Sequence, residues 1–140
     1  MHWGSRLSAP VFLALILCAC AVGPTGPTKE EITNADYGHD MSPEECTTIA
    51  QQFITNKLKD PGSAQFRNNT SCVKGYWNAS PFQGLSVAFG WLQIGEVNGK
   101  NSFGGYVGFT PYQVLIKDGI VIRYCITDQD GLCLVHGKYE

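Results

Sequence analysis

The sequence predicts a small α+β domain in which one amphipathic helix packs on an antiparallel sheet of about four to six strands, braced by disulfide bonds. Three observations lead to this prediction. A capped segment near residue 42 has apolar residues at helical spacing, later segments alternate apolar and polar residues between turn signals, and four cysteines lie in the same region. Residues 41–140 suffice for one such domain and no more.

The helix is expected to begin at Ser42. Ser42 can cap it, Pro43 suits the first helical position, and Glu45 completes a capping box. The run Asp60-Pro61-Gly62 is expected to end it. Apolar residues recur on one face, which we interpret as core rather than as a partner-binding groove: Cys46, Ile49, Ala50, Phe53, Ile54 and Leu58.

The first strands are expected after this helix. Residues 66–73 are predicted to form a short polar strand, and residues 74–84 an aromatic-rich loop. Apolar residues alternate over residues 85–91 and then change parity at Leu92. A change of face within one strand predicts a β-bulge near residues 90–92.

The later strands are separated by clear turn signals. Residues 97–99 begin a turn, and the partner strand follows with Tyr112, Val114 and Ile116 alternating. Asp118-Gly119 predicts a tight hairpin, because this pair readily adopts the turn that matches strand twist. Residues 120–126 form the return strand, residues 128–131 a further turn, and residues 132–135 a last short strand.

The N-terminus has the pattern of an export signal. An apolar run over residues 11–20 follows Arg6 and is too short to span a bilayer as a helix. Its end, Leu17-Cys18-Ala19-Cys20, resembles a bacterial lipobox. This resemblance implies that residues 1–19 are removed as a lipoprotein signal peptide and that Cys20 is lipidated. The alternative is an ordinary signal peptide, cut near Ala19 or Ala21.

Lipidation predicts a location in the bacterial cell envelope. Several acyl chains at about 0.8 kcal/mol per buried methylene give near-permanent anchoring. Ala21 occupies the position where an inner-membrane retention signal usually has Asp, so resemblance to bacterial sorting rules favours the outer membrane, on its periplasmic face or its surface. Gly-Pro pairs in residues 20–40 predict a flexible tether between the lipid and the domain.

An even number of cysteines in an exported domain predicts two disulfides. The four cysteines, Cys46, Cys72, Cys125 and Cys133, allow three pairings, and we favour Cys46–Cys72 with Cys125–Cys133. A zinc site is the weaker alternative, because the sequence has no Cys-x-x-Cys pair in this region.

Charge and motifs exclude several functions. Removal of residues 1–19 takes away one of ten Lys and Arg residues and leaves twelve Asp and Glu residues, so the formal charge becomes −3 and nucleic-acid binding is not expected. Residues 104–108 are rich in glycine, but β-patterned residues follow them, not a phosphate-binding helix. Residues 128–131 lack the flanking acids of a calcium loop. We expect no metal and no cofactor.

Two segments resemble a small domain of uncharacterised bacterial exported proteins and lipoproteins. They are Leu58-Lys-Asp-Pro-Gly-Ser-Ala-Gln-Phe66 and Gly95-Glu-Val-Asn-Gly-Lys-Asn-Ser-Phe-Gly-Gly-Tyr-Val-Gly-Phe109. The resemblance implies the fold and export, and it carries no assigned reaction. One difference from the family is Ile94, where members often have cysteine.

The function predicted from these patterns is that of a non-enzymatic binding or accessory lipoprotein. No Gly-x-Ser-x-Gly elbow is present, and no catalytic residues are expected. Expected partners are the bilayer, through Cys20, and an envelope protein or glycan. The alternatives are an inhibitor of a secreted enzyme such as lysozyme, and a hydrolase that uses His136. The candidate binding loop contains Asn98, Lys100, Asn101, Phe103 and Tyr106.

Overall fold

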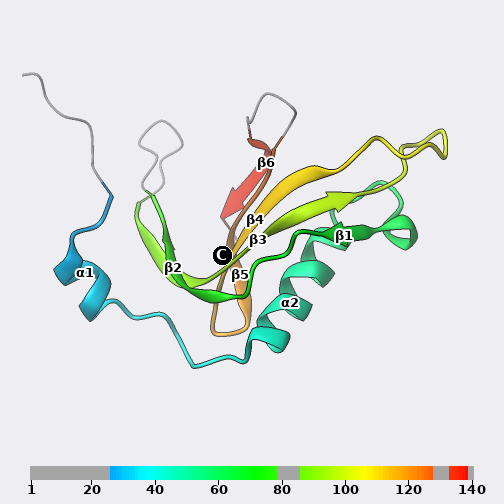
Figure 1. Ribbon diagram of the computed structural model, residues 1–140. Coiled ribbons are helices and arrows are strands. Elements are labelled where there is room, and N and C mark those ends of the chain that lie inside the picture. Colours follow the sequence, from blue (N-terminus) through cyan, green and yellow to red (C-terminus); the bar gives the residue numbers. More distant parts are fainter. Residues whose placement is uncertain (1–25, 79–85, 128–132, 139–140) are drawn as a thin grey trace, which may run out of the picture.

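The computed structural model describes residues 26–78, 86–127 and 133–138, the last of these by backbone alone. Two helices, a short 3-10 turn and six strands follow one another along the chain (Figure 1). Their bounds are α1 Lys29–Asn34, α2 Pro43–Thr55, η1 Pro61–Ser63, β1 Gln65–Arg67, β2 Val73–Trp77, β3 Ala88–Asn98, β4 Thr110–Lys117, β5 Ile120–Thr127 and β6 Cys133–Lys138.

All described strands belong to one antiparallel sheet with the order β1-β3-β4-β5-β6. β2 also pairs with β3, on the same edge as β1 and further along that strand. The six described strands therefore occupy five positions across the sheet, because β1 and β2 share one. The predicted fold class, a helix packed on an antiparallel sheet, is confirmed.

Helix α2 covers one face of the sheet (Figure 1). Ser42 caps it as predicted, since Ser42 Oγ accepts a hydrogen bond of 3.1 Å from the backbone N–H of Glu45, but the return bond from Glu45 that would complete the predicted capping box is not among those of the described residues. Cys46, Ala50 and Ile54 are fully buried on the predicted apolar stripe. They pack in one core with buried residues of β3, β4 and β5, among them Val97, Tyr112, Val114, Ile116 and Tyr124.

The predicted β-bulge in β3 is wrong. β3 is paired without interruption to β4 from Trp91 to Val97, and the described register shifts lie between β4 and β5 and between β5 and β6. The apolar residues of β3 change from one face of the strand to the other at Leu92 because both faces contact apolar residues. Trp91 pairs with Ile116 on the helix side, and Leu92 pairs with the buried Leu115 on the other side.

The strand predicted over residues 66–73 is divided in two, and β2 continues into the segment predicted as a loop. The chain leaves the ladder between β1 and β2, where Thr70 donates its N–H to the Ile94 carbonyl at 2.9 Å. This excursion brings Cys72 to Cys46 of α2, with a Cα–Cα distance of 6.1 Å. The predicted Cys46–Cys72 disulfide is therefore confirmed. Cys125 is also disulfide-bonded. Its pairing with Cys133 stays a prediction, because the Cys133 side chain lies outside the described ones.

The segment before α2 has regular structure, which corrects the prediction of a flexible tether for residues 29–40. Thr28 and Glu31 form a capping box that begins α1. After α1, residues 35–41 form a strap along the domain. Asp36 pairs with Lys117 at 2.9 Å. The Gly-Pro pairs lie before this helix, so their effect on the backbone does not extend to it.

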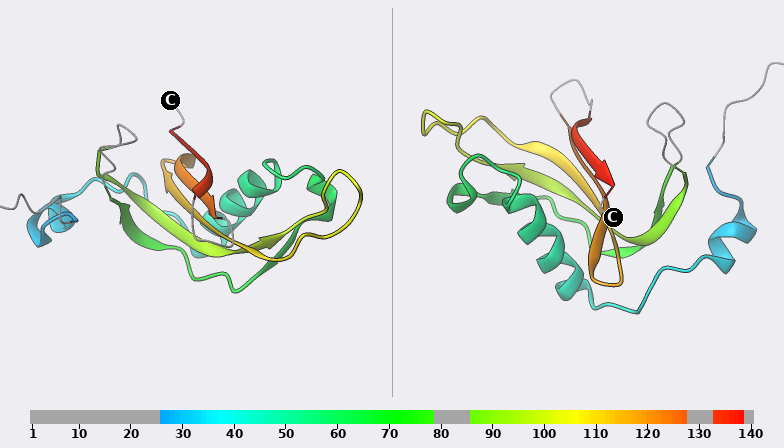
Figure 2. Two further views of the ribbon diagram at one scale, coloured as in Figure 1. Left: turned by 90° about the horizontal axis from the view of Figure 1, so that it is seen from above. Right: turned by 180° about the vertical axis from the view of Figure 1, so that it is seen from behind.

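Two more side-chain contacts hold the strap to the sheet. His39 Nδ1 lies 3.3 Å from Asp118 Oδ1 at the β4–β5 turn, and Asp40 lies 2.8 Å from the ammonium of Lys74 in β2. Seen from above and from behind, the strap joins α2 to α1, and α1 lies at the β2 end of the domain (Figure 2). The opposite end carries the connection between β3 and β4 (Figures 1 and 2).

The predicted signal peptide, residues 1–19, and the lipidation site Cys20 lie outside the described residues. Within the described part of the chain, no helix has the length and apolar character needed to cross a membrane.

Candidate binding loop and neighbouring surfaces

The connection between β3 and β4, residues 99–109, is closed by its own hydrogen bonds. Asn101 N–H donates to the Gly105 carbonyl at 2.8 Å, and Lys100 and Tyr106 form a β-bridge. Asn101 Oδ1 accepts from the backbone N–H groups of Phe103 and Gly105 at 2.9 and 3.1 Å. One side chain therefore satisfies two amides at the turn of the loop, which favours a single loop conformation.

The base of this loop is attached to the segment that follows α2. Lys100 N–H donates to Ser63 Oγ at 2.8 Å, and Ser63 is buried. Gly99 packs against Leu58, where an added Cβ would lie 3.1 Å from a Leu58 methyl carbon. The two segments that carry the family resemblance are thus in contact, because η1 and β1 support the start of the β3–β4 loop.

The tip of the loop presents apolar side chains to solvent. Phe103 is 96% exposed, Val107 is 60% exposed and Tyr106 is 46% exposed. The Lys100 ammonium lies 5.5 Å from the centre of the Tyr106 ring, within the range of a cation–π contact. Phe103 therefore contributes almost no buried surface to the described domain.

The five predicted loop residues have different positions. Asn98 is buried, and its Oδ1 accepts from Gly108 N–H at 3.1 Å, so it supports the base of the loop rather than its rim. Asn101 braces the turn from inside. Lys100, Phe103 and Tyr106 form the accessible surface.

A hollow of about 280 Å³ lies between this loop and the end of α2. Leu58, Val97 and Ile126 contribute apolar surface to it, and the described lining contains no acidic residue. Sequence reasoning missed the contribution of residues 57–59, although Leu58 and Lys59 belong to the first segment of the family resemblance. The full lining is Lys57, Leu58, Lys59, Val97, Gly99, Lys100, Asn101, Val107, Gly108, Thr110 and Ile126.

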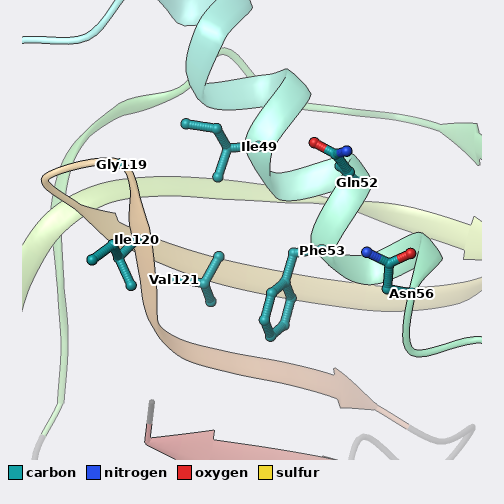
Figure 3. Close-up of a pocket in the computed structure, with 7 residues that line it drawn as sticks. All are labelled: Ile49, Gln52, Phe53, Asn56, Gly119, Ile120 and Val121. Carbon is teal, nitrogen blue, oxygen red and sulfur yellow. The ribbon is translucent and has the colours of Figure 1, made fainter. Parts of the chain in front are cut away.

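A second recess, of about 430 Å³, lies between α2 and the β4–β5 turn (Figure 3). Ile49 and Phe53 of the helix face Ile120 and Val121 of β5 across it, and the amides of Gln52 and Asn56 lie at its rim. Ile120 is 60% exposed. This recess has no charged or nucleophilic group in its described lining, so it supplies apolar contact area and no acid–base chemistry.

Hydrogen bonds and burial shift the pKa values of some ionisable groups among the described residues. Hydrogen bonds from the Arg67 and Asn68 side chains lower the pKa of Glu96. Burial raises the pKa of Tyr112 to about 12, and its hydroxyl donates to Asn69 Oδ1 at 2.9 Å. These shifts stabilise the ordinary charge state of each group, which is the opposite of what a general acid or base at neutral pH requires.

A cluster of ligating side chains would indicate a metal site, and a suitably placed histidine would indicate a hydrolase. Among the described residues, no group of three or more His, Cys, Asp or Glu side chains is placed to hold a metal ion. His39 is half-exposed and pairs with Asp118. The His136 side chain, proposed for a hydrolase, lies outside the described ones.

Comparison with known protein families, with curated proteins and with solved structures finds no match for this chain.

Proposed function

We propose that this chain is a lipid-anchored envelope protein that binds a partner protein through the β3–β4 loop, without catalysing a reaction. The observation that carries the proposal is the exposure of Phe103, 96%, at the tip of a loop braced by Asn101. Binding energy in protein interfaces concentrates in a few side chains, and aromatic residues on rigid supports are frequent among them.

The position of the loop relative to the anchor supports the same proposal. Gly26 lies beside Asn78 and Tyr76 near the end of β2, so the described chain begins at the end of the domain that is remote from the loop. A lipid on Cys20, six residues before Gly26, would be at most about 20 Å from that end. The loop would then be directed away from the anchoring bilayer and towards a partner in the envelope.

Photo-crosslinking in native membranes tests this proposal. A benzophenone amino acid replaces Phe103 in the full chain, and another replaces Ile94, which is 39% exposed on β3, as the control. We expect a discrete crosslinked protein with the probe at 103 and a much weaker one with the control. Equal crosslinking at both positions, or none at 103, would contradict the proposal. A Cys20→Ser variant tests the anchor separately, and it should move the protein from the membrane fraction to the aqueous fraction.

One alternative is favoured by a specific feature of the loop. Inhibition of a glycan-cleaving enzyme such as lysozyme requires a preformed loop that enters a cleft containing two carboxyl groups. Lys100, beside Tyr106 in the loop, has the charge that such a cleft attracts. The test is the rate of muramidase action with and without the purified protein. Inhibition that Phe103→Ala and Lys100→Gln both remove would support this alternative over a non-inhibitory partner.

A further inference from the structure

We propose that the hollow beside the β3–β4 loop binds an acidic segment of a partner protein that also carries aliphatic side chains. This inference rests on the proposed function, because it assigns a chemical class to the partner of the same loop. Three features of the described residues support it: a lining that has lysines and no acidic residue, an apolar floor, and the size of the space.

Lysines line the hollow, and its described lining contains no acidic residue. Arg67, Lys74 and Lys117 each form an ion pair, with Glu96, Asp40 and Asp36. Lys59 and Lys100 form none among the described residues, and both line the hollow. Because lysines line the hollow and its described lining contains no acidic residue, the charge of the hollow is complementary to a carboxylate from outside.

The apolar floor of the hollow also favours a ligand that carries aliphatic side chains. Leu58, Val97 and Ile126 supply apolar surface between the lysines, and Val107 adds to it from the loop. Burying an aliphatic side chain there would remove apolar surface from water and so favour binding. A carboxylate flanked by such a side chain matches this arrangement, whereas a free inorganic anion would leave the floor exposed to water.

Other classes of partner fit less well. The lining, as far as the structure describes it, contains no aromatic ring on which a sugar could stack. The whole chain has a net charge of −2, which opposes approach to a nucleic acid. A volume of about 280 Å³ is at the lower limit for small-molecule sites, and it accommodates a few side chains of a peptide.

The experiment measures binding of a fluorescent peptide of alternating glutamate and leucine to the full lipidated chain in detergent, by anisotropy. The control peptide has glutamine in place of glutamate. We expect the acidic peptide to bind at least ten-fold more tightly. Lys59→Glu and Lys100→Glu should each weaken it about five-fold, because each reverses an exposed charge at the site. Lys29→Glu, the matched reversal on α1 at the other end of the domain, should change affinity less than two-fold.

Each result decides a separate point. Equal affinity for the two peptides, or equal effects of Lys59→Glu and Lys29→Glu, would overturn the assignment of an acidic partner. Binding to vesicles of anionic lipid or to single-stranded DNA, with no binding of the peptide, would also overturn it. Failure of the proposed function has a different signature: the acidic peptide binds at the hollow, but the probe at position 103 captures no protein in membranes.

Discussion

Replacing Asn101 with alanine tests whether the β3–β4 loop is preorganised. Asn101 Oδ1 accepts hydrogen bonds from two backbone amides, those of Phe103 and Gly105, at 2.9 and 3.1 Å. Asn101→Ala removes both bonds without removing any backbone contact of the loop. The variant therefore changes the internal support of the loop and leaves the exposed side chains of the candidate binding surface in place.

The expected magnitude follows from these two bonds. A net hydrogen bond contributes about 0.5–1.5 kcal/mol, and the lower half of this range applies here because water can replace the lost acceptor at exposed amides. The closed loop should lose about 1–2 kcal/mol relative to open conformations. Because 1.4 kcal/mol corresponds to a factor of ten, we expect roughly five- to thirty-fold faster hydrogen exchange at the amides of Phe103 and Gly105.

Amide exchange measured by NMR on the full chain is the appropriate assay. Asn101→Asp is the matched control, since its carboxylate oxygen can accept the same two hydrogen bonds. Amides in the buried strands, such as that of Val114, should be unaffected in both variants. Unchanged exchange at Phe103 and Gly105 in Asn101→Ala would refute the conclusion that Asn101 braces the loop. Equal acceleration in the core would show that the effect is global rather than local.

Three further predictions concern the domain that supports the loop. The Cys46–Cys72 disulfide closes a loop with a sequence separation of 26, which should stabilise the fold by about 3.5 kcal/mol. The double variant Cys46→Ala/Cys72→Ala should therefore have a melting temperature lower by at least ~15 °C in calorimetry, and a change of only a few degrees would contradict this. Hydrogen bonds from the Lys117 and Lys74 side chains lower the pKa values of Asp36 and Asp40, respectively, below the ordinary 3.8. The stabilisation that these two ion pairs contribute is therefore fully present above pH 3.8 and is lost as the pH falls through the lowered pKa values of the two aspartates. Backbone amides of the strap should then lose protection from hydrogen exchange in acid before those of the sheet, and simultaneous loss would refute this prediction. Gly90→Ala would bring a Cβ into collision with the backbone of β4, and we expect a cost of about 1–3 kcal/mol in urea denaturation, against near-neutrality for Ala at the open position Gly105.

The parts of the fold that depend on local chemistry could be predicted from the sequence. Ser42 and Pro43 locate the start of α2, because capping depends on adjacent residues alone. The Asp118-Gly119 turn is also as predicted, with φ values of 53° and 76°. The end of α2 is less well predicted: the helix stops at Thr55, before Asp60-Pro61-Gly62, and a series of turns connects the two.

Features that depend on tertiary contacts could not be predicted in the same way. The parity change at Leu92 predicts a bulge only if one face of β3 alone carries apolar residues, whereas Leu92 pairs with the buried Leu115 on the second face. The strap depends on ion pairs with Lys74 of β2 and Lys117 of β4 and on the contact of His39 with Asp118, all of them distant in sequence.

The candidate site likewise has features that follow from the local sequence and features that depend on tertiary contacts. A glycine-rich polar connection between two strands indicates an accessible loop, and Phe103 is indeed exposed. Its sequence does not indicate that Asn98 turns inward or that Lys59, which lies some forty residues earlier, lines the same hollow. That association depends on the pairing of β1 with the end of β3, which is a long-range contact.

The most direct test of the central claim is the comparison of photo-crosslinking from positions 103 and 94 in native membranes. A braced recognition loop predicts one dominant protein captured from position 103, little capture from position 94, and a lower yield when Asn101→Ala is added. Capture that is equally strong from both positions, or that Asn101→Ala leaves unchanged, would contradict recognition through this loop.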